Sequence, residues 1–80
     1  MPEHLELNAR RLLCPMPVIR TQDKIKQMTR GDTLTVICTD PGALNDIPTW
    51  CRINQHRVIR QETINDEYLI TLEVDADAPK

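Results

Sequence analysis

Aromatic residues are nearly absent from this chain of 80 residues, which has one Trp, one Tyr and no Phe. The core must therefore be aliphatic, and base stacking of the kind used by RNA-binding domains is poorly provided for. A basic excess is absent too, because ten Lys and Arg stand against twelve Asp and Glu, a formal net charge of −2. This balance argues against nucleic-acid binding driven by phosphate neutralisation.

Long apolar runs and a signal-peptide pattern are also missing from the sequence. We therefore expect no membrane association and a cytoplasmic location, where thiols stay reduced. Cys14, Cys38 and Cys51 form an odd set without Cys-x-x-Cys spacing. Neither a disulfide framework nor a zinc site is predicted.

Hydrophobic residues make up 40% of the chain and charged residues 28%, a balance typical of a folded domain. The length predicts a single domain over 1–80, with a short frayed tail at 75–80. A core this small leaves no room for a deep pocket, so we expect the protein to present a group at its surface.

Six elements are predicted from hydrophobic periodicity and from turn residues: strands at 4–8, 33–39, 56–64 and 68–74, and helices from 15 to about 29 and from 46 onward. The order βαβαββ indicates an α/β (α+β) two-layer sandwich, in which two helices cover one face of a four-stranded mixed sheet. Asn65-Asp66 is expected to form the hairpin turn between the last two strands.

The helix boundaries rest on particular residues. Gly31 stands where a C-terminal cap of the first helix belongs, and Asp46 is expected to cap the second helix with Pro48 in its first turn. The apolar face of the first helix is predicted to consist of Val18, Ile19, Ile25 and Met28.

The run Cys14-Pro15-Met16-Pro17 is the strongest candidate for a reactive site. Proline is favoured at the first helical position, which places Cys14 at the N-cap and Pro15 next, with Pro17 third. The backbone N–H groups of Met16 and Val18 would then point toward the cap. A thiolate there gains about 0.3–1 kcal/mol from the helix dipole, and helix N-termini lower the pKa of cysteines.

No general base is evident beside Cys14, since His4 and His56 are distant in sequence. This pattern favours a module that hands over a group rather than a self-sufficient enzyme. Arg10 and Arg11 could further stabilise a thiolate. The alternative is that Cys-Pro merely starts a helix, although Ser, Asp or Asn caps better.

Other residues have two interpretations each. Cys38, on an inward strand face, and Cys51, on the apolar side of a helix, are expected in the core; a resolving role for Cys51 stays open. The arginines Arg10, Arg11 and Arg20 form either a docking patch for an acidic partner or a solvated charged face. Met16 either projects outward as a partner contact or packs on the sheet edge.

The sequence resembles the TusA/SirA-like sulfur carrier family, whose motif reads Leu-Asp-x-x-Gly-x-x-Cys-Pro-x-Pro. The matching run here is Leu7-Asn8-Ala9-Arg10-Arg11-Leu12-Leu13-Cys14-Pro15-Met16-Pro17, and a second family feature appears as Asp40-Pro41, Asp46-Ile47-Pro48 and Cys51. Asn8 replaces the family's Asp and Arg11 its Gly. Because Gly tolerates a positive φ better than Arg, we expect the loop before Cys14 to take another path.

The resemblance implies that Cys14 carries sulfur as a persulfide, with no other cofactor. It implies a cysteine desulfurase or rhodanese as donor and a DsrE-type or other sulfur-accepting protein as recipient, in tRNA thiolation, molybdenum cofactor supply or sulfur oxidation. A non-catalytic regulatory or interaction module using the same helix N-terminus is the alternative, and direct RNA binding is a third, weaker one.

Overall fold

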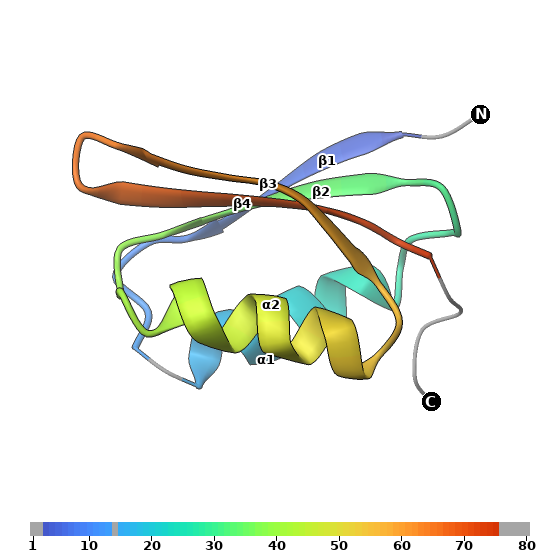
Figure 1. Ribbon diagram of the computed structural model, residues 1–80, viewed down its shortest axis with the longest axis horizontal. Coiled ribbons are helices and arrows are strands. Elements are labelled where there is room, and N and C mark those ends of the chain that lie inside the picture. Colours follow the sequence, from blue (N-terminus) through green and yellow to red (C-terminus); the bar gives the residue numbers. More distant parts are fainter. Residues whose placement is uncertain (1–2, 14, 76–80) are drawn as a thin grey trace.

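The chain folds into two layers, a sheet and a pair of helices that cover one of its faces (Figure 1). A computed structural model describes residues 3–13 and 15–75. Its elements are β1 (His4–Ala9), α1 (Met16–Ile25), β2 (Thr33–Cys38), α2 (Ala43–Ile53), β3 (Arg57–Ile64) and β4 (Glu67–Glu73). The predicted α/β sandwich with the order βαβαββ is confirmed.

The sheet has the strand order β1-β2-β4-β3. β1 and β2 run parallel, whereas β4 is antiparallel to both β2 and β3. The sheet is therefore mixed, as predicted, with β1 and β3 at its edges. Because β1 and β2 are parallel, their carboxyl ends lie at the same end of the sheet, and each leads into one of the two helices.

The core is aliphatic and lies between the sheet and the helices. Alternate residues of the two central strands point into it, as the two-residue period predicts. Both helices contribute side chains from the other side. Its fully buried members include Leu34, Val36 and Cys38 of β2, Ile70 and Leu72 of β4, Ile25 of α1, and Ile47 and Cys51 of α2.

The edge strand β3 is the weakly patterned strand of the prediction, and its register explains why. Val58 lies opposite Leu72, but Arg60 already lies opposite Thr71. The extra residue, Ile59, forms a bulge, and a bulge breaks the alternation of inward and outward side chains.

The hairpin that joins β3 to β4 turns at Asn65 and Asp66, as predicted. Their φ angles of 51° and 65° are the left-handed values of a type I′ turn, which Asn and Asp tolerate. Asp75, the first residue of the predicted tail, donates its N–H to Nδ1 of His56 at 3.3 Å; the rest of that tail lies outside the described residues.

Helix α1 is shorter than predicted, because it ends at Ile25 rather than near Thr29. The predicted cap, Gly31, lies beyond the helix in a turn, where its N–H donates to the carbonyl oxygen of Val74 at 2.8 Å. The Asp32 carboxylate organises this turn by accepting the N–H of Thr29 at 3.0 Å. Such a side-chain acceptor gives the backbone an alternative to the helical hydrogen bonds.

The predicted apolar face of α1 is only partly right. Ile25 and Met28 are buried and Val18 packs against the core, but Ile19 is 42% exposed. Thr21 is buried instead, and its hydroxyl donates to the carbonyl oxygen of Pro17 at 2.8 Å. A polar side chain can lie in the core here because this local bond satisfies it.

Helix α2 begins at Ala43, before the predicted start at Asp46, and Pro48 lies inside it. The earlier start follows from Asp40, whose carboxylate accepts the N–H of Gly42 at 3.0 Å and whose carbonyl oxygen accepts the N–H of Ala43 at 3.1 Å. Asp46 is in the first turn, where a negative charge is favourable.

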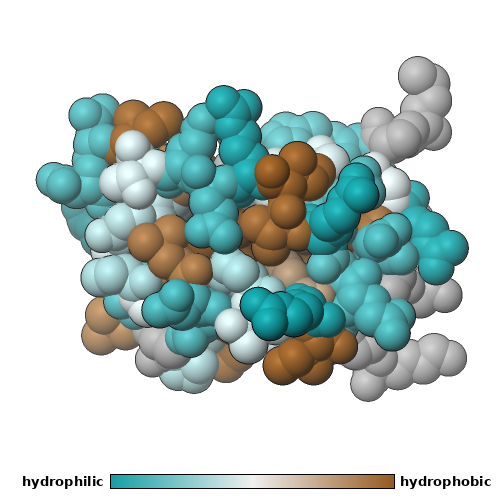
Figure 2. Space-filling model, in the orientation of Figure 1, coloured by the Kyte–Doolittle hydropathy of each residue, from teal (hydrophilic) through white to brown (hydrophobic). Residues whose placement is uncertain are grey.

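Apolar residues on the face shown in Figure 2 form separate patches among polar ones. The most exposed large apolar side chains are spread over the loop before α1, both helices and β3: Leu13, Ile19, Ile53, Ile59 and Ile64. Among residues 3–13 and 15–75, no helix has both the length and the apolar character needed to cross a bilayer.

Candidate functional site

The predicted reactive residue, Cys14, precedes the N-cap of α1 in the sequence and lies outside the described residues. Its neighbours in the chain are at the surface, since Leu13 is 75% exposed and Pro15 is also exposed. Pro15 is the N-cap of α1 rather than its first helical residue. The Met16 N–H, predicted to point toward the cap, instead donates to the carbonyl oxygen of Leu13 at 2.8 Å.

The first turn of α1 is held against the core by Pro17, which is buried, and by Val18, which packs on the core from a half-buried position. Met16 is also half-buried. This turn contains no acidic residue. Nothing within it therefore opposes a negative charge near the positive end of the helix dipole.

Arg11 occupies the position where the family motif has Gly, and its φ angle is 64°. The expectation that Arg avoids this conformation is wrong, because Arg11 takes the left-handed backbone that Gly adopts most easily. For an L-residue this conformation costs about 1–2 kcal/mol. The Arg11 N–H donates to Oγ1 of Thr39 at 2.9 Å, a bond that ties the loop to the end of β2.

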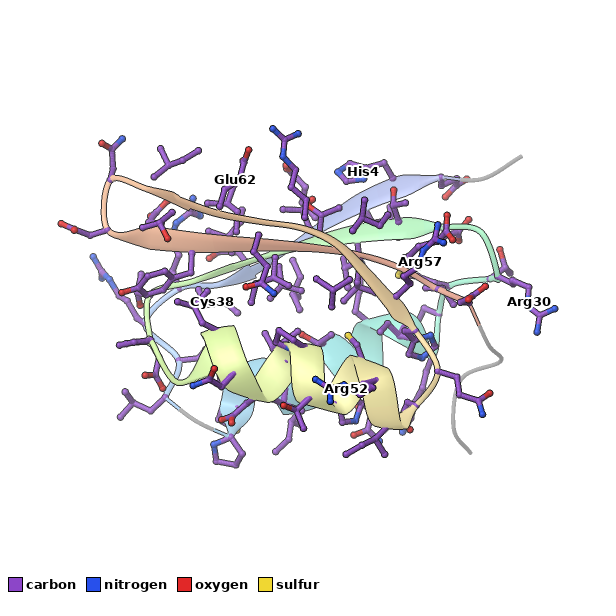
Figure 3. All side chains as sticks on the ribbon, in the orientation of Figure 1. His4, Arg30, Cys38, Arg52, Arg57 and Glu62 are labelled. Carbon is purple, nitrogen blue, oxygen red and sulfur yellow. The ribbon has the colours of Figure 1, made fainter. Side chains whose placement is uncertain are left out.

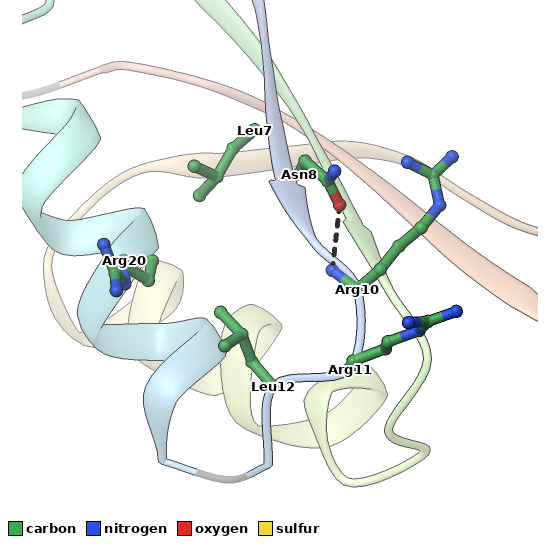
Figure 4. Close-up of a pocket in the computed structure, with 6 residues that line it drawn as sticks. All are labelled: Leu7, Asn8, Arg10, Arg11, Leu12 and Arg20. Atoms are coloured by element: carbon green, nitrogen blue, oxygen red, sulfur yellow. Dashed lines mark hydrogen bonds between the residues drawn. The ribbon is translucent and has the colours of Figure 1, made fainter.

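Asn8 and Arg10 shape the beginning of the same loop. The Asn8 side-chain oxygen accepts the N–H of Arg10 at 3.1 Å, the dashed line of Figure 4. An amide oxygen can thus accept the bond that an Asp carboxylate would accept in such a turn. The replacement of the family's Asp by Asn8 therefore preserves this local contact.

The guanidinium group of Arg10 is bound to a carboxylate from the far end of the sequence. Its Nε lies 2.5 Å and its Nη2 3.1 Å from the two carboxylate oxygens of Glu67, the first residue of β4. This bidentate contact lowers the pKa of Glu67. Arg10 therefore connects the loop to the β3–β4 hairpin.

A groove of about 490 Å³ lies where β1, the loop and α1 meet. All three arginines of the predicted docking patch line it, together with three residues of β1 and the loop: Leu7, Asn8 and Leu12. Figure 4 shows Arg20, from α1, on one side of the groove and Arg10 and Arg11 on the other. Sequence spacing alone brings Arg10 and Arg11 together, but the fold is needed to add Arg20.

Cys38 and Cys51 are fully buried and free, as predicted. Figure 3 shows Cys38 between the sheet and α2. Burial is the main cause that raises the pKa of Cys38 to about 11, with Asp40 adding to it, and burial raises the pKa of Cys51 to about 12. Both thiols are therefore protonated and unreactive near neutral pH.

The histidines have structural positions that the sequence did not indicate. His56 is buried and stacks on Trp50 with ring centroids 5.5 Å apart. Desolvation lowers the pKa of His56, which favours the neutral ring. His4 contacts Oγ1 of Thr33 at 2.7 Å on the open face of the sheet. Within residues 3–13 and 15–75, no three potential ligands gather as a metal site would require.

Comparisons with known proteins agree with this architecture. The crystal structure of a SirA-like protein from Desulfitobacterium hafniense superimposes with a TM-score of 0.79, covering 90% of this chain and 99% of that one. The two sequences are 18% identical, so this likeness establishes the fold. A family model described as Sulfurtransferase TusA matches residues 5–74. Since this match spans most of the chain, the protein belongs to the TusA sulfurtransferase family.

Proposed function

We propose that this protein carries sulfane sulfur as a persulfide on Cys14 and passes it between partner proteins. The family match carries the proposal, because residues 5–74 include the Cys-Pro-Met-Pro run at 14–17. Work in a sulfur relay with partner proteins is the general role of this family. The assignment of the persulfide to Cys14 is our inference from the chemistry of the residues.

The transfer needs only one nucleophile in this chain. The Cys14 thiolate attacks the outer sulfur of a donor persulfide, a new S–S bond forms, and the donor's S–S bond breaks as its own thiolate leaves. The number of electrons is unchanged, so no oxidant or further cofactor is required. In the second step a recipient thiolate attacks the outer sulfur of the Cys14 persulfide in the same way.

The surroundings of position 14 favour a thiolate. Position 14 follows Arg11 in the chain and precedes a helix of ten residues whose first turn lacks acidic groups, whereas the charge of Arg10 is paired with Glu67. Helix N-termini and nearby cations lower the pKa of a cysteine. The exposed neighbours Leu13 and Pro15 are suited to contact a partner during transfer.

We propose the following partners and products for this sulfur transfer. The donor would be a cysteine desulfurase or rhodanese in the cytoplasm, and the recipient a DsrE-type or other sulfur-accepting protein. Proton transfers are left to these partners, because both histidines, His4 and His56, are distant from Cys14 in the sequence. The downstream product would be thiolated tRNA, a molybdenum cofactor or an oxidised sulfur compound.

Intact-protein mass spectrometry after incubation with inorganic polysulfide tests the central claim. We expect a gain of one sulfur atom that a reducing agent removes and that Cys14→Ser abolishes. Cys38→Ala and Cys51→Ala are matched controls, because both remove a thiol from the buried core and should load normally. Equal loading of the Cys14→Ser protein would reject the proposal and favour the non-catalytic interaction module.

A further inference from the structure

The three arginines that line the groove differ in what neutralises their charge. Glu67 holds Arg10 by two contacts. Arg11 and Arg20 are exposed, and their guanidinium groups form no ion pair with any residue among 3–13 and 15–75. The groove therefore offers two guanidinium groups without a partner in that part of the chain, in a protein whose formal net charge is −2.

The two arginines stand on opposite sides of an apolar strip. Arg20 comes from α1 and Arg11 from the loop, and the side chains of Leu7 and Leu12 lie between them (Figure 4). Both leucines are half-buried against the core, so each keeps some apolar surface toward the groove. The groove therefore has a cationic side chain on each side and an apolar strip between them.

The position of Arg11 is fixed before any ligand arrives. Its left-handed backbone sets the direction in which the side chain leaves the loop, and the bond from its N–H to Thr39 holds that backbone. Gln55 has a similar φ of 66°, so the conformation alone indicates no ligand. Together with an unneutralised charge beside a groove, however, it provides a preorganised binding group.

The groove also lies beside a free strand edge. β1 is the outermost strand and pairs only with β2 among the described elements. An extended peptide can run along such an edge, with its backbone near the strand and alternate side chains directed into adjacent pockets. The groove is thus open to an extended chain and is not limited to a small ion.

We propose that this groove binds an extended segment of a partner protein in which an apolar side chain is flanked by carboxylates. The apolar side chain would pack on Leu7 and Leu12, and the carboxylates would pair with Arg11 and Arg20. The inference rests on the proposed function only in identifying that partner as the sulfur donor or recipient. It makes the two arginines determinants of partner choice.

The test uses the full chain and the probe Ac-Glu-Glu-Leu-Glu-Glu-NH₂, titrated at constant ionic strength while ¹H–¹⁵N NMR spectra are recorded. We expect saturable shifts at the backbone amides of Leu7, Asn8 and Leu12 and at the side chain of Arg20. Replacing the probe's Leu by Gly, or its Glu residues by Lys, should abolish them. Arg11→Gly and Arg20→Gln should each weaken binding about two- to fivefold.

Arg30→Gln is the matched control, because it removes the same charge at the opposite end of the molecule (Figure 3) and should leave the affinity unchanged. The proposal would be overturned if Arg30→Gln caused an equal loss of affinity or if the probe gave no saturable shifts. Equally strong shifts with sulfate would also overturn it, because they would assign the groove to a small oxyanion.

Loading of Cys14 by inorganic polysulfide separates this inference from the proposed function, since it needs no partner. If Cys14 loads normally but the groove does not bind the probe, the peptide-binding proposal is rejected and the proposed sulfur transfer is not affected. If the groove binds the probe but Cys14 is never loaded with sulfur, the peptide site is supported. The partner that it binds is then not a sulfur donor or recipient.

Discussion

Two loops leave the same end of the sheet, and each leads from a parallel strand into a helix (Figure 1). In the first, residues 10–15, Arg11 has a strained left-handed backbone and an exposed charge. The second, residues 39–42, is closed by a local bond in which the Asp40 carboxylate accepts the N–H of Gly42 at 3.0 Å. The first loop therefore contains a strained residue at the surface, whereas none of residues 39–42 has a positive φ.

The two neighbouring loops have different structural roles. The bond from the Arg11 N–H to Oγ1 of Thr39 joins them, so the locally satisfied loop supports the strained one. Strain is retained in a protein only where the surrounding structure compensates for it. The second loop and the end of β2 supply that compensation here.

The largest expected difference between the two regions is in thiol reactivity. Cys38 ends β2, next to the second loop, and its pKa of about 11 leaves about one thiolate in a thousand at pH 8. Cys14 belongs to the first loop by its position in the sequence, and it should be ionised to tens of per cent or more at pH 8. Iodoacetamide at pH 8 should therefore label Cys14 at least a hundredfold faster, as peptide mapping would measure.

Denaturation provides the control for this labelling experiment. In denaturant, where burial is lost, Cys38 and Cys51 should react as fast as an ordinary cysteine. Their rapid labelling in the native protein would contradict the burial described above. Slow labelling of Cys14 at pH 8 would contradict a lowered pKa at the start of α1.

The early turns of the two helices should differ next, in stability. Ile47 of α2 is fully buried, so Ile47→Ala should lower the free energy of unfolding by about 2–5 kcal/mol. Ile19 of α1 is 42% exposed, and Ile19→Ala should change it by less than about 0.5 kcal/mol. Urea unfolding followed by circular dichroism measures both, and similar losses would show that the start of α1 is packed as firmly as α2.

The sheet could be predicted from sequence because its signals are local and repeated. Leu34, Val36 and Cys38 alternate with outward residues, and Asn65-Asp66 is a strong turn signal. The helix limits could not be predicted in the same way. They depend on Asp32 and Asp40, whose carboxylates bind backbone N–H groups in turns outside the helices.

The candidate site likewise has some features that local sequence predicts and others that only the fold creates. The Cys-Pro-Met-Pro run is contiguous, so position 14 could be chosen from sequence alone. The contact between Arg10 and Glu67 spans 57 residues, and Arg20 joins the groove only because α1 packs beside β1. No periodicity indicates such contacts, since they arise from the topology of the sheet.

Breaking the local closure of the second loop should have a smaller effect than removing Ile47. Asp40→Ala removes the acceptor of the Gly42 N–H and should cost about 0.5–2 kcal/mol, as the loss of a capping side chain does. Asp40→Asn keeps an acceptor oxygen and should cost less. Thermal unfolding of both variants measures the difference, and equal losses would show that the charge of Asp40 matters more than this bond.

Relieving the strain of the first loop should have the smallest effect, and in the opposite direction. Arg11→Gly removes the penalty of a left-handed L-residue, but it also makes the unfolded chain more flexible, so we expect a gain of up to about 1 kcal/mol. Arg11→Ala removes the same charge and keeps the strain, so it should give no gain. Urea unfolding of the two variants isolates the backbone contribution, because they differ only by one methyl group. A more stable Ala variant would mean that the Arg11 side chain, rather than its φ angle, destabilises the loop, and the contrast between the two loops would then be one of charge alone.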